Sequence, residues 1–436
     1  MLGLITYSVI LVALAVGTWW RPSIGLAAVL CLYGLKQWGQ STTEFLADYR
    51  QITNYAVGVI ALIGVALAAS RRSCIFCQLP GSVSLIWILY AYAFMSIAWA
   101  PDTLGSLQQW GIQGPYIATV VLLAPLLLST VQDVRTAFLA TAITGATICG
   151  LALLFGNWGF RGLILYGDVT ETETNPLALA SMAGTVLVIA GLSLIRPNIV
   201  PIRVFALACI PVALAVILKS GSRGQLLASG MGLVAAWPIA VRLKDMRSFG
   251  ALLVAATLLI GLGWWAYTLV DIDTNRWSSI DSNDAVLGRL ALARALLSIA
   301  ASHPLTMLFG LGNSSAITLL SIYPHITGIE VLAEEGLLGA VIYISIIILT
   351  FRSVSRVVRT LGERQRERHA VAMLVGLFVF ELVLSWKQGT LLSSVYVFAY
   401  SIMLGRIDLQ LVEGSTPAEP QLAMSSRLPP FSNLMP

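Results

Sequence analysis

The sequence predicts an all-α, polytopic integral membrane protein with about 12–13 transmembrane helices. Hydrophobic residues make up 57% of its 436 residues and charged residues only 11%, whereas soluble domains contain about 25% charged residues. The apolar runs are continuous and do not alternate as barrel strands would, so helices satisfy their backbone hydrogen bonds. This composition excludes a soluble enzyme, a disordered chain and a nucleic-acid-binding protein, in spite of an isoelectric point near 9.0.

Thirteen apolar segments follow one another along the chain, and most approach the roughly 20 residues that a crossing needs. Segments 3–19 and 22–37 are joined only by the Trp20-Arg21 corner, so one of them could be a re-entrant or tilted half-span, which leaves 12 crossings possible. The thirteen are 3–19, 22–37, 51–70, 73–101, 103–132, 136–160, 174–195, 204–218, 224–241, 248–270, 336–351, 370–386 and 388–405.

These segments divide the chain into four parts. We expect an N-terminal transmembrane bundle over 1–270, an outer loop over 271–335, C-terminal transmembrane helices over 336–405 and a flexible cytoplasmic tail over 406–436. The start of the chain lacks the charged region of a cleavable signal peptide, so we expect the first helix to be retained.

The distribution of Lys and Arg predicts the orientation. If the loop 271–335 lies outside, the inner loops hold 17 of the 26 basic residues, including the arginine-rich stretch 352–369. The reverse assignment would place the larger share outside, against the positive-inside rule. The loop 271–335 is therefore expected to be periplasmic, and the net charge of +5 is a topology signal.

The outer loop combines a helix with strong helix breakers. A helix capped by Ser282 or Asp284 is expected to run to about Ser302. Its spacing predicts an amphipathic helix that lies along the membrane interface, with one face made of Arg289, Leu292, Leu296 and Ile299.

The segment after this helix, SHPLTMLFGLGNSSA, contains Pro304 and a Gly-x-Gly turn that should break any helix. Pro324 suits the start of the next helix and would place His325 at its outer mouth.

A second outer feature is the short link LKSGSRGQLLASG, in which Lys219 and Arg223 flank a Gly-Ser turn. A guanidinium group matches phosphate oxygens, and helix N-termini add anion-binding donors. Ionisable groups within apolar runs are usually paired or functional, so Glu381 near Lys387 indicates either an ion pair or a substrate contact.

Each of these residues also has a structural interpretation. Arg223 could anchor a helix end at the membrane surface, Arg289 could lie on a solvated face, and His325 could cap its helix. No P-loop, dinucleotide fingerprint or H-E-x-x-H motif occurs, and the chain has three histidines. We therefore expect no cofactor and no metal.

Three stretches resemble the O-antigen ligase and O-antigen polymerase superfamily, whose members handle undecaprenyl-pyrophosphate-linked glycans at the periplasmic face of the bacterial inner membrane. They are SGSRGQLLA (220–228), GRLALARALLSIAASHPLTMLFGLGNSSA (288–316) and PHITGIEVLAEEGLLG (324–339). One departure is Ile326, which stands where the family usually has Asn.

The resemblance implies a glycosyltransferase of lipopolysaccharide or exopolysaccharide biosynthesis. It implies that Arg223 and Arg289 bind the donor pyrophosphate and that His325 acts on the acceptor hydroxyl. The acceptor would be a saccharide or a lipid A-core-type molecule, and Glu334 would bind or orient. Lys219 and Lys387 are further candidates for substrate binding on the same face.

The residue types suit this chemistry. Guanidinium groups stabilise the charge that develops on a leaving pyrophosphate, and a neutral histidine can accept the proton of the attacking hydroxyl. The sequence shows no obvious carboxylate nucleophile, so direct displacement with inversion is the simpler hypothesis. Ligase and polymerase stay equally open. A transporter or flippase of lipid-linked saccharides and a non-catalytic scaffold are the alternatives.

Overall fold

The computed structural model describes residues 2–71, 79–159, 162–167, 176–195, 200–241, 279–362 and 364–413. The expected span 248–270 lies outside these residues. The described elements are α1 (Leu2–Trp20), η1 (Pro22–Ile24), α2 (Gly25–Leu30), α3 (Leu32–Thr42), α4 (Glu44–Asp48), α5 (Ile52–Arg71), α6 (Gly81–Ser96), η2 (Ile97–Trp99), α7 (Thr103–Tyr116), η3 (Ile117–Leu123), η4 (Ala124–Leu127), α8 (Val131–Phe155), β1 (Trp158–Gly159), β2 (Gly162–Leu163), α9 (Pro176–Leu194), α10 (Val200–Lys219), α11 (Arg223–Ala240), α14 (Ser279–Ala300), α15 (Pro304–Phe309), α16 (Ser315–Leu320), α17 (Thr327–Glu334), α18 (Gly336–Leu361), α19 (Gln365–Gln388) and α20 (Val395–Glu413).

The protein is an all-α polytopic membrane protein. Within the described ranges, ten helices are long and apolar enough to cross a membrane, and β1 and β2 form one short antiparallel pair. The ten lie at Gly3–Trp20, Ile52–Arg71, Gly81–Trp99, Thr103–Leu127, Val131–Phe155, Leu177–Leu194, Val200–Lys219, Gly336–Leu361, Gln365–Gln388 and Val395–Val412. Each overlaps an apolar segment that the sequence predicted.

Two predicted segments differ from a simple span. Segment 22–37 is divided into η1, α2 and α3, with a break at Cys31, so it does not form one straight crossing. Segment 224–241 forms α11, which has the length of a span but is not apolar enough to count among the ten. Gln225 and Ser229 are buried in α11, so part of its polar content faces other helices.

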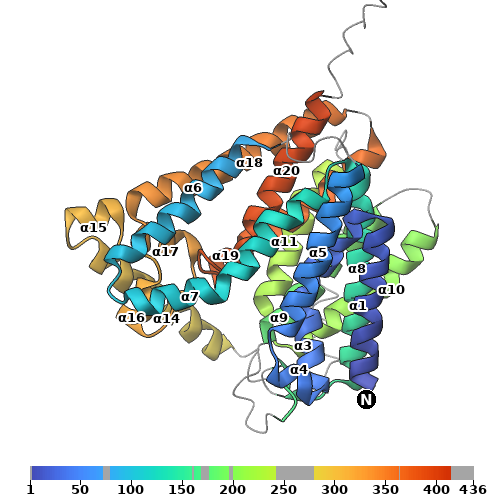
Figure 1. Cartoon of the computed structure of the whole chain (residues 1–436), viewed down its shortest axis with the longest axis horizontal. Coiled ribbons are helices and arrows are strands. Elements are labelled where there is room, and N and C mark those ends of the chain that lie inside the picture. Colours follow the sequence, from blue (N-terminus) through green and yellow to red (C-terminus); the bar gives the residue numbers. More distant parts are fainter. Residues whose placement is uncertain are drawn as a thin grey trace, which may run out of the picture.

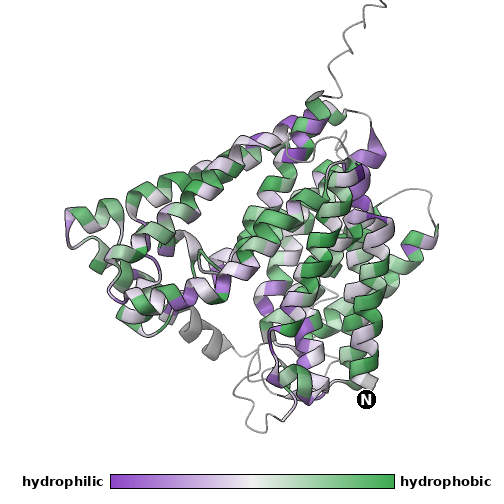
Figure 2. Ribbon diagram, viewed as in Figure 1, coloured by the Kyte–Doolittle hydropathy of each residue, from purple (hydrophilic) through white to green (hydrophobic). Residues whose placement is uncertain are grey.

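The helices form a bundle with a projecting arm (Figure 1). In the bundle, α11 packs on α9 and α19, while α20 packs on α18 and α19. In the arm, α6 and α18 run side by side, and α14 to α17 gather near their far end together with the start of α7. Apolar residues dominate the helices of both parts (Figure 2). The outer-loop residues after 279 therefore form a helical cap on the arm.

A close crossing joins α11 to α19. A Cβ atom added to Gly232 would lie 2.5 Å from the carbonyl oxygen of Gly376, and one added to Gly376 would lie 3.2 Å from the carbonyl oxygen of Gly232. Small residues allow membrane helices to approach this closely. This crossing places the start of α11 beside the end of α19.

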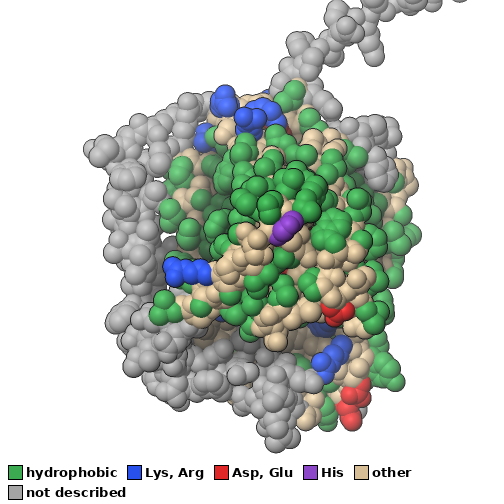
Figure 3. Space-filling model, turned by 90° about the vertical axis from the view of Figure 1, so that its left-hand side faces the viewer, with side chains coloured by type: hydrophobic (Ala, Val, Ile, Leu, Met, Phe, Trp, Pro, Cys, Tyr) green, Lys and Arg blue, Asp and Glu red, His purple; other side chains and the backbone are tan. Residues whose placement is uncertain are grey.

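The arginine-rich end of the bundle is held by polar contacts. The Arg356 side chain bonds Asp408, and the fully buried Arg406 donates to the carbonyl oxygen of Leu128. Figure 3 shows a hydrophobic face with Lys and Arg side chains gathered at its upper edge. The expectation of a flexible tail from residue 406 is wrong for its first part, because α20 continues in helical form to Glu413 and packs against the bundle.

Candidate functional site

A tight backbone turn spans residues 310–316 of the cap. Gly310 has φ 84° and ψ 173°, a conformation that is essentially restricted to glycine. Leu311 and Gly312 donate backbone hydrogen bonds to the carbonyl oxygens of Ala333 and Glu334, both 2.9 Å long. The Gly-x-Gly turn and the start of the Glu-x-Gly segment are therefore in direct contact.

This turn differs from expectation in one respect. The helix α14 ends at Ala300 and Gly310 ends the next helix, but Pro304 begins that six-residue helix, α15. Likewise, Pro324 does not begin the next helix, because α17 starts at Thr327. The chain then breaks again at Gly336, with φ 69°, before the long helix α18 begins.

Glu334 is buried inside this turn. Its two carboxylate oxygens accept hydrogen bonds from the backbone amides of Ser314 and Ala316, each 2.8 Å long. Burial raises the pKa of Glu334 to about 7, and burial followed by repulsion from Glu334 raises the pKa values of Glu330 and Glu335. Glu334 thus orients the turn, and its expected contact with substrate stays a prediction.

Asn313 ties the turn to the tip of the α6–α7 hairpin. Its amide nitrogen donates to Glu335, and its side-chain oxygen accepts from Trp110 at 2.9 Å. Its backbone bonds Ser96 of α6 and Ser106 of α7, each at 2.9 Å. The buried residue Asn313 therefore joins the turn to α6, to α7 and to Glu335 between α17 and α18.

His325 lies in the extended link between α16 and α17 with a left-handed backbone, φ 59°. Such conformations in non-glycine residues cost free energy and are concentrated at functional sites. The imidazole Nδ1 is buried and, within the described residues, has no hydrogen-bond partner. The Gln388 main chain at the end of α19 hydrogen-bonds the ring.

Arg289, in α14, acts on His325 through its positive charge. Burial lowers the pKa of His325, and the positive charge of Arg289 lowers it further, while the hydrogen bond to Gln388 opposes both. The neutral imidazole is thereby favoured. In α14, Leu296 is fully buried and packs with Ala333 and Leu311, whereas Arg294 is exposed, and the expected position of this helix along the membrane interface stays a prediction.

Arg223 is the first residue of α11 and lies beside Lys387. A Cβ atom added to Gly224 would lie 2.1 Å from the Lys387 ammonium nitrogen, so the lysine side chain crosses the backbone next to Arg223. One residue further, the side chain of Gln225 donates to the Gln388 side-chain oxygen at 2.9 Å. The start of α11 is thus joined to the residue that contacts His325.

The site therefore brings together three of the predicted positions directly around Gln388. His325 contacts it, Lys387 precedes it, and Arg223 is linked to it through Gln225. Arg289 joins through its charge interaction with His325. Lys219 is more peripheral, with its ammonium 5.2 Å from the ring centroid of Trp158.

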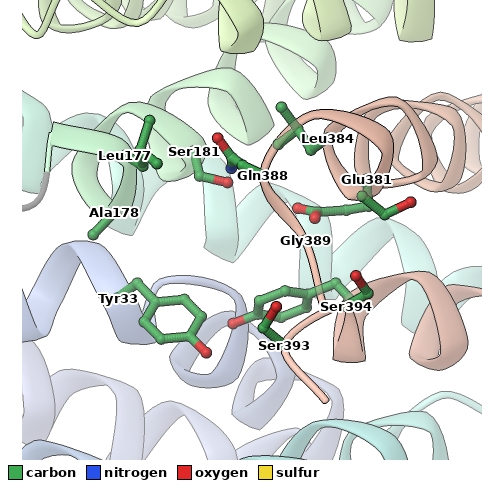
Figure 4. Close-up of a pocket in the computed structure, with 12 residues that line it drawn as sticks. Tyr33, Leu177, Ala178, Ser181, Glu381, Leu384, Gln388, Gly389, Ser393 and Ser394 are labelled. Carbon is green, nitrogen blue, oxygen red and sulfur yellow. The ribbon is translucent and has the colours of Figure 1, made fainter. Parts of the chain in front are cut away.

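Sequence reasoning missed Gln225 and Gln388. Both are amide side chains at the ends of apolar helices, which was a signal that could have marked them. It also left open whether Glu381 pairs with Lys387, and no ion pair joins these two residues among those the structure describes. Glu381 instead lines a cavity of about 240 Å³ that reaches Gln388 (Figure 4).

The arrangement offers cationic groups, a neutral imidazole and a polar cavity at one end of a membrane bundle. It can bind an anion and accept a proton from a neighbouring hydroxyl group. In the described ranges, no group of three or more His, Cys, Asp or Glu side chains could hold a metal ion.

These features define a polytopic membrane protein with a polar site at one end of its helix bundle. No protein-family model matches the chain, and no curated protein matches it.

Proposed function

We propose that the protein is a membrane glycosyltransferase that uses an undecaprenyl-pyrophosphate-linked glycan as donor. It transfers the glycan to a saccharide or lipid A-core-type acceptor, or polymerises it, at the periplasmic face of a bacterial inner membrane. The observation that carries this proposal is the environment of His325. Its left-handed backbone, the charge of Arg289 and an Nδ1 that has no partner in the described part of the chain fit a general base beside an anion-binding group.

Arg223 and Arg289 would bind the pyrophosphate. Both side chains are half-buried, and Arg223 lies at the N-terminus of an 18-residue helix, where backbone donors add to the attraction of an anion. Lys387 lies over the adjacent backbone and adds positive charge. These groups would stabilise the charge that develops on the phosphate oxygens as the glycosidic bond breaks.

His325 would take the proton of the acceptor hydroxyl as its oxygen attacks the anomeric carbon. Glu330, Glu334 and Glu335 are buried and not exposed to act as nucleophiles. Glu330 and Glu334 accept backbone hydrogen bonds, and Glu335 bonds Asn313. Direct displacement with inversion therefore remains the simplest course. The donor is already activated, so the proposal needs neither metal nor cofactor.

A complementation experiment tests the proposal. A strain that lacks the gene is complemented with wild type, His325→Asn, or Arg223→Gln together with Arg289→Gln, and Arg294→Gln serves as a control on the exposed face of α14. Asparagine tolerates a left-handed backbone, so His325→Asn removes the base with little strain. We expect loss of mature glycan with the first two variants and wild-type glycan with the control.

The products distinguish the two forms of the reaction. Long chains that stay on undecaprenyl indicate a ligase, whereas single repeats on the acceptor indicate a polymerase. If well-expressed His325→Asn and the double arginine variant both restore wild-type glycan, the proposed site is wrong.

A flippase of lipid-linked saccharide is the second candidate, and Glu381 favours it because an ionisable group within a span often marks a transport path. This candidate predicts that deletion strands the lipid-linked glycan at the cytoplasmic face. Accessibility of the glycan to a sugar-modifying enzyme in sealed, right-side-out vesicles separates the two functions.

A further inference from the structure

The cavity beside Gln388 has a different character from the cationic groups around His325. Its volume is about 240 Å³, and α3, α9, α19, α20 and the 389–394 link all contribute to its wall. Pockets for drug-sized ligands are about 300–1,000 Å³. A ligand group of the size of one sugar ring suits this cavity better than a chain of sugars.

Glu381 is the one ionisable carboxyl group among the described residues that line the cavity. It projects from α19 into the space that Figure 4 shows, and its carboxylate has no hydrogen bond or ion pair within the described part of the chain. Among the residues that the structure describes, no Lys, Arg or His lines the wall. Lys36 lies behind it, where its ammonium bonds the Tyr116 hydroxyl at 3.1 Å. Within the described residues, the wall therefore offers a pyrophosphate no cation.

The remaining wall suits a neutral, hydroxyl-rich ligand. Tyr33 stacks on Tyr116 at a centroid distance of 5.5 Å and meets Tyr396 edge-on at 6.0 Å, so its ring position is fixed. The Tyr33 hydroxyl has no hydrogen-bond partner among the described residues. An aromatic face packs against the C–H groups of a sugar ring, while a carboxylate accepts strong hydrogen bonds from its hydroxyls.

Gln388 connects this cavity to His325. Its side chain lines the cavity, and its main chain hydrogen-bonds the imidazole ring. A sugar held between Tyr33 and Glu381 would therefore extend toward the proposed base. The donor pyrophosphate would remain on the other side of Gln388, near Arg223.

We propose that the cavity between Tyr33, Glu381 and Gln388 binds the terminal neutral sugar of the acceptor. This inference rests on the proposed function for the identity of the ligand as an acceptor. Sugar binding in the cavity is a separate property of the molecule and can be measured without any transfer reaction.

The binding experiment uses the purified full-length protein in nanodiscs and ligand-observed NMR. The probes are free glucose, galactose, mannose and N-acetylglucosamine, with inorganic pyrophosphate as a separate probe. Glu381→Gln replaces the carboxyl group by an amide, Ala178→Trp fills the cavity from α9, and Glu44→Gln is the matched control at an exposed carboxyl group.

We expect at least one neutral sugar to bind wild type and Glu44→Gln. Binding should weaken at least about tenfold in Glu381→Gln, because an amide offers a sugar a different set of donors and acceptors from a carboxyl group. Binding should be lost in Ala178→Trp, because the indole occupies the cavity. Pyrophosphate binding should be unchanged in these variants, which also shows that they are folded. If Glu381→Gln does not fold, Ala178→Trp decides.

The proposal is overturned if wild type binds no sugar, or if Glu381→Gln and Ala178→Trp bind sugar as tightly as wild type does. The cavity would then be a hydrated space. A transfer assay then assigns the source of the sugar, with membranes that contain donor titrated with acceptor isolated from the deletion strain. Glu381→Gln should raise the acceptor concentration for half-maximal transfer at least about tenfold and leave that of the donor unchanged. The reverse pattern would assign the cavity to the donor sugar.

These outcomes separate the two proposals. Sugar binding in the cavity together with an active His325→Asn variant refutes the proposed function and keeps the binding site. An inactive His325→Asn variant together with unaffected Glu381→Gln and Ala178→Trp variants keeps the function and refutes the site.

Discussion

His325 combines a strained backbone with an electrostatic setting that favours its neutral form. A left-handed conformation costs a non-glycine residue roughly 1–2 kcal/mol, so the surrounding contacts must hold it in place. One of those contacts is the hydrogen bond between the ring and the Gln388 main chain. His325 thus combines an unfavourable backbone conformation with an Nδ1 that has no partner among the described residues. A role in the reaction explains this combination better than a role in stability does.

The first prediction concerns the titration of this ring. The pKa of His325 should lie below the value of about 6.5 for a free histidine, and Arg289→Gln should raise it because a positive neighbour that disfavours imidazolium is removed. Imidazole NMR signals, assigned with His325→Asn, measure both values. Arg294→Gln should leave the titration unchanged. An unchanged pKa of His325 in Arg289→Gln would contradict the charge interaction between the two residues.

The second prediction separates strain from stability. His325→Gly should abolish transfer, and it should not lower the thermal unfolding midpoint, since glycine adopts a positive φ without cost. His325→Ala should be less stable than His325→Gly by roughly 1 kcal/mol. Calorimetry in detergent compares the two variants. Equal midpoints would show that the left-handed backbone stores no strain.

Sequence reasoning reached part of this site. His325, Arg223 and Arg289 stood out because they are polar groups next to helix ends in an apolar chain. Gln225 and Gln388 did not, because their role depends on the crossing of α11 with α19, more than 150 residues apart. Local patterns carry no information about which amides will meet across such a distance.

At the scale of elements, glycine residues lie where the backbones of neighbouring elements approach most closely. Gly310 and Gly336 allow backbones to touch, since a Cβ atom added to Gly310 would lie 2.0 Å from the Glu334 carbonyl oxygen. The apolar segments predicted the long helices well. They did not predict α15 or the break between α17 and α18, because these depend on positive φ angles that only the packed cap requires.

The third prediction tests this packing. Gly310→Ala should destabilise the protein by roughly 2–4 kcal/mol, since both the backbone conformation and the contact with Glu334 oppose a side chain. Gly288→Ala is the control, because nothing lies within 4 Å of its added Cβ. Thermal unfolding measures both. Similar midpoints would mean that the turn rearranges at little cost.

The fourth prediction concerns the α11–α19 crossing. Gly232→Val should push the helices apart, because its side chain would meet the Gly376 carbonyl group, and it should reduce transfer by moving Arg223 away from Gln388. Gly230→Val is the control on the same helix, in open space. Glycan transfer and thermal stability are measured together. Full transfer by Gly232→Val would show that the crossing does not position the site.

At the scale of the whole molecule, two opposite ends carry different chemistry. One end holds the cap, His325 and the end of α19, while the other holds the arginines of α18 and the start of α19. Helices of span length join them. The asymmetry of Lys and Arg predicts that the arginine-rich end faces the cytoplasm.

The fifth prediction tests this orientation by cysteine labelling in intact cells. In a background with Cys74 and Cys77 replaced by serine, Arg294→Cys should react with a membrane-impermeant maleimide, whereas Arg359→Cys should react only after permeabilisation. Both positions are exposed, and Cys31, Cys149 and Cys209 are buried. The opposite labelling pattern would invert the topology and place His325 in the cytoplasm.

The hydrogen bonds of Asn313 also constrain how the protein is made. Trp110 and Ser106 bond a residue that follows them in the chain by 203 and 207 residues. At a synthesis rate of roughly 5–20 residues per second, the tip of the α6–α7 hairpin is inserted many seconds before the cap exists. Assembly of the site is therefore a late event in biogenesis, and a nascent chain that stalls before residue 313 would present an unfinished hairpin to the quality-control proteases of the membrane.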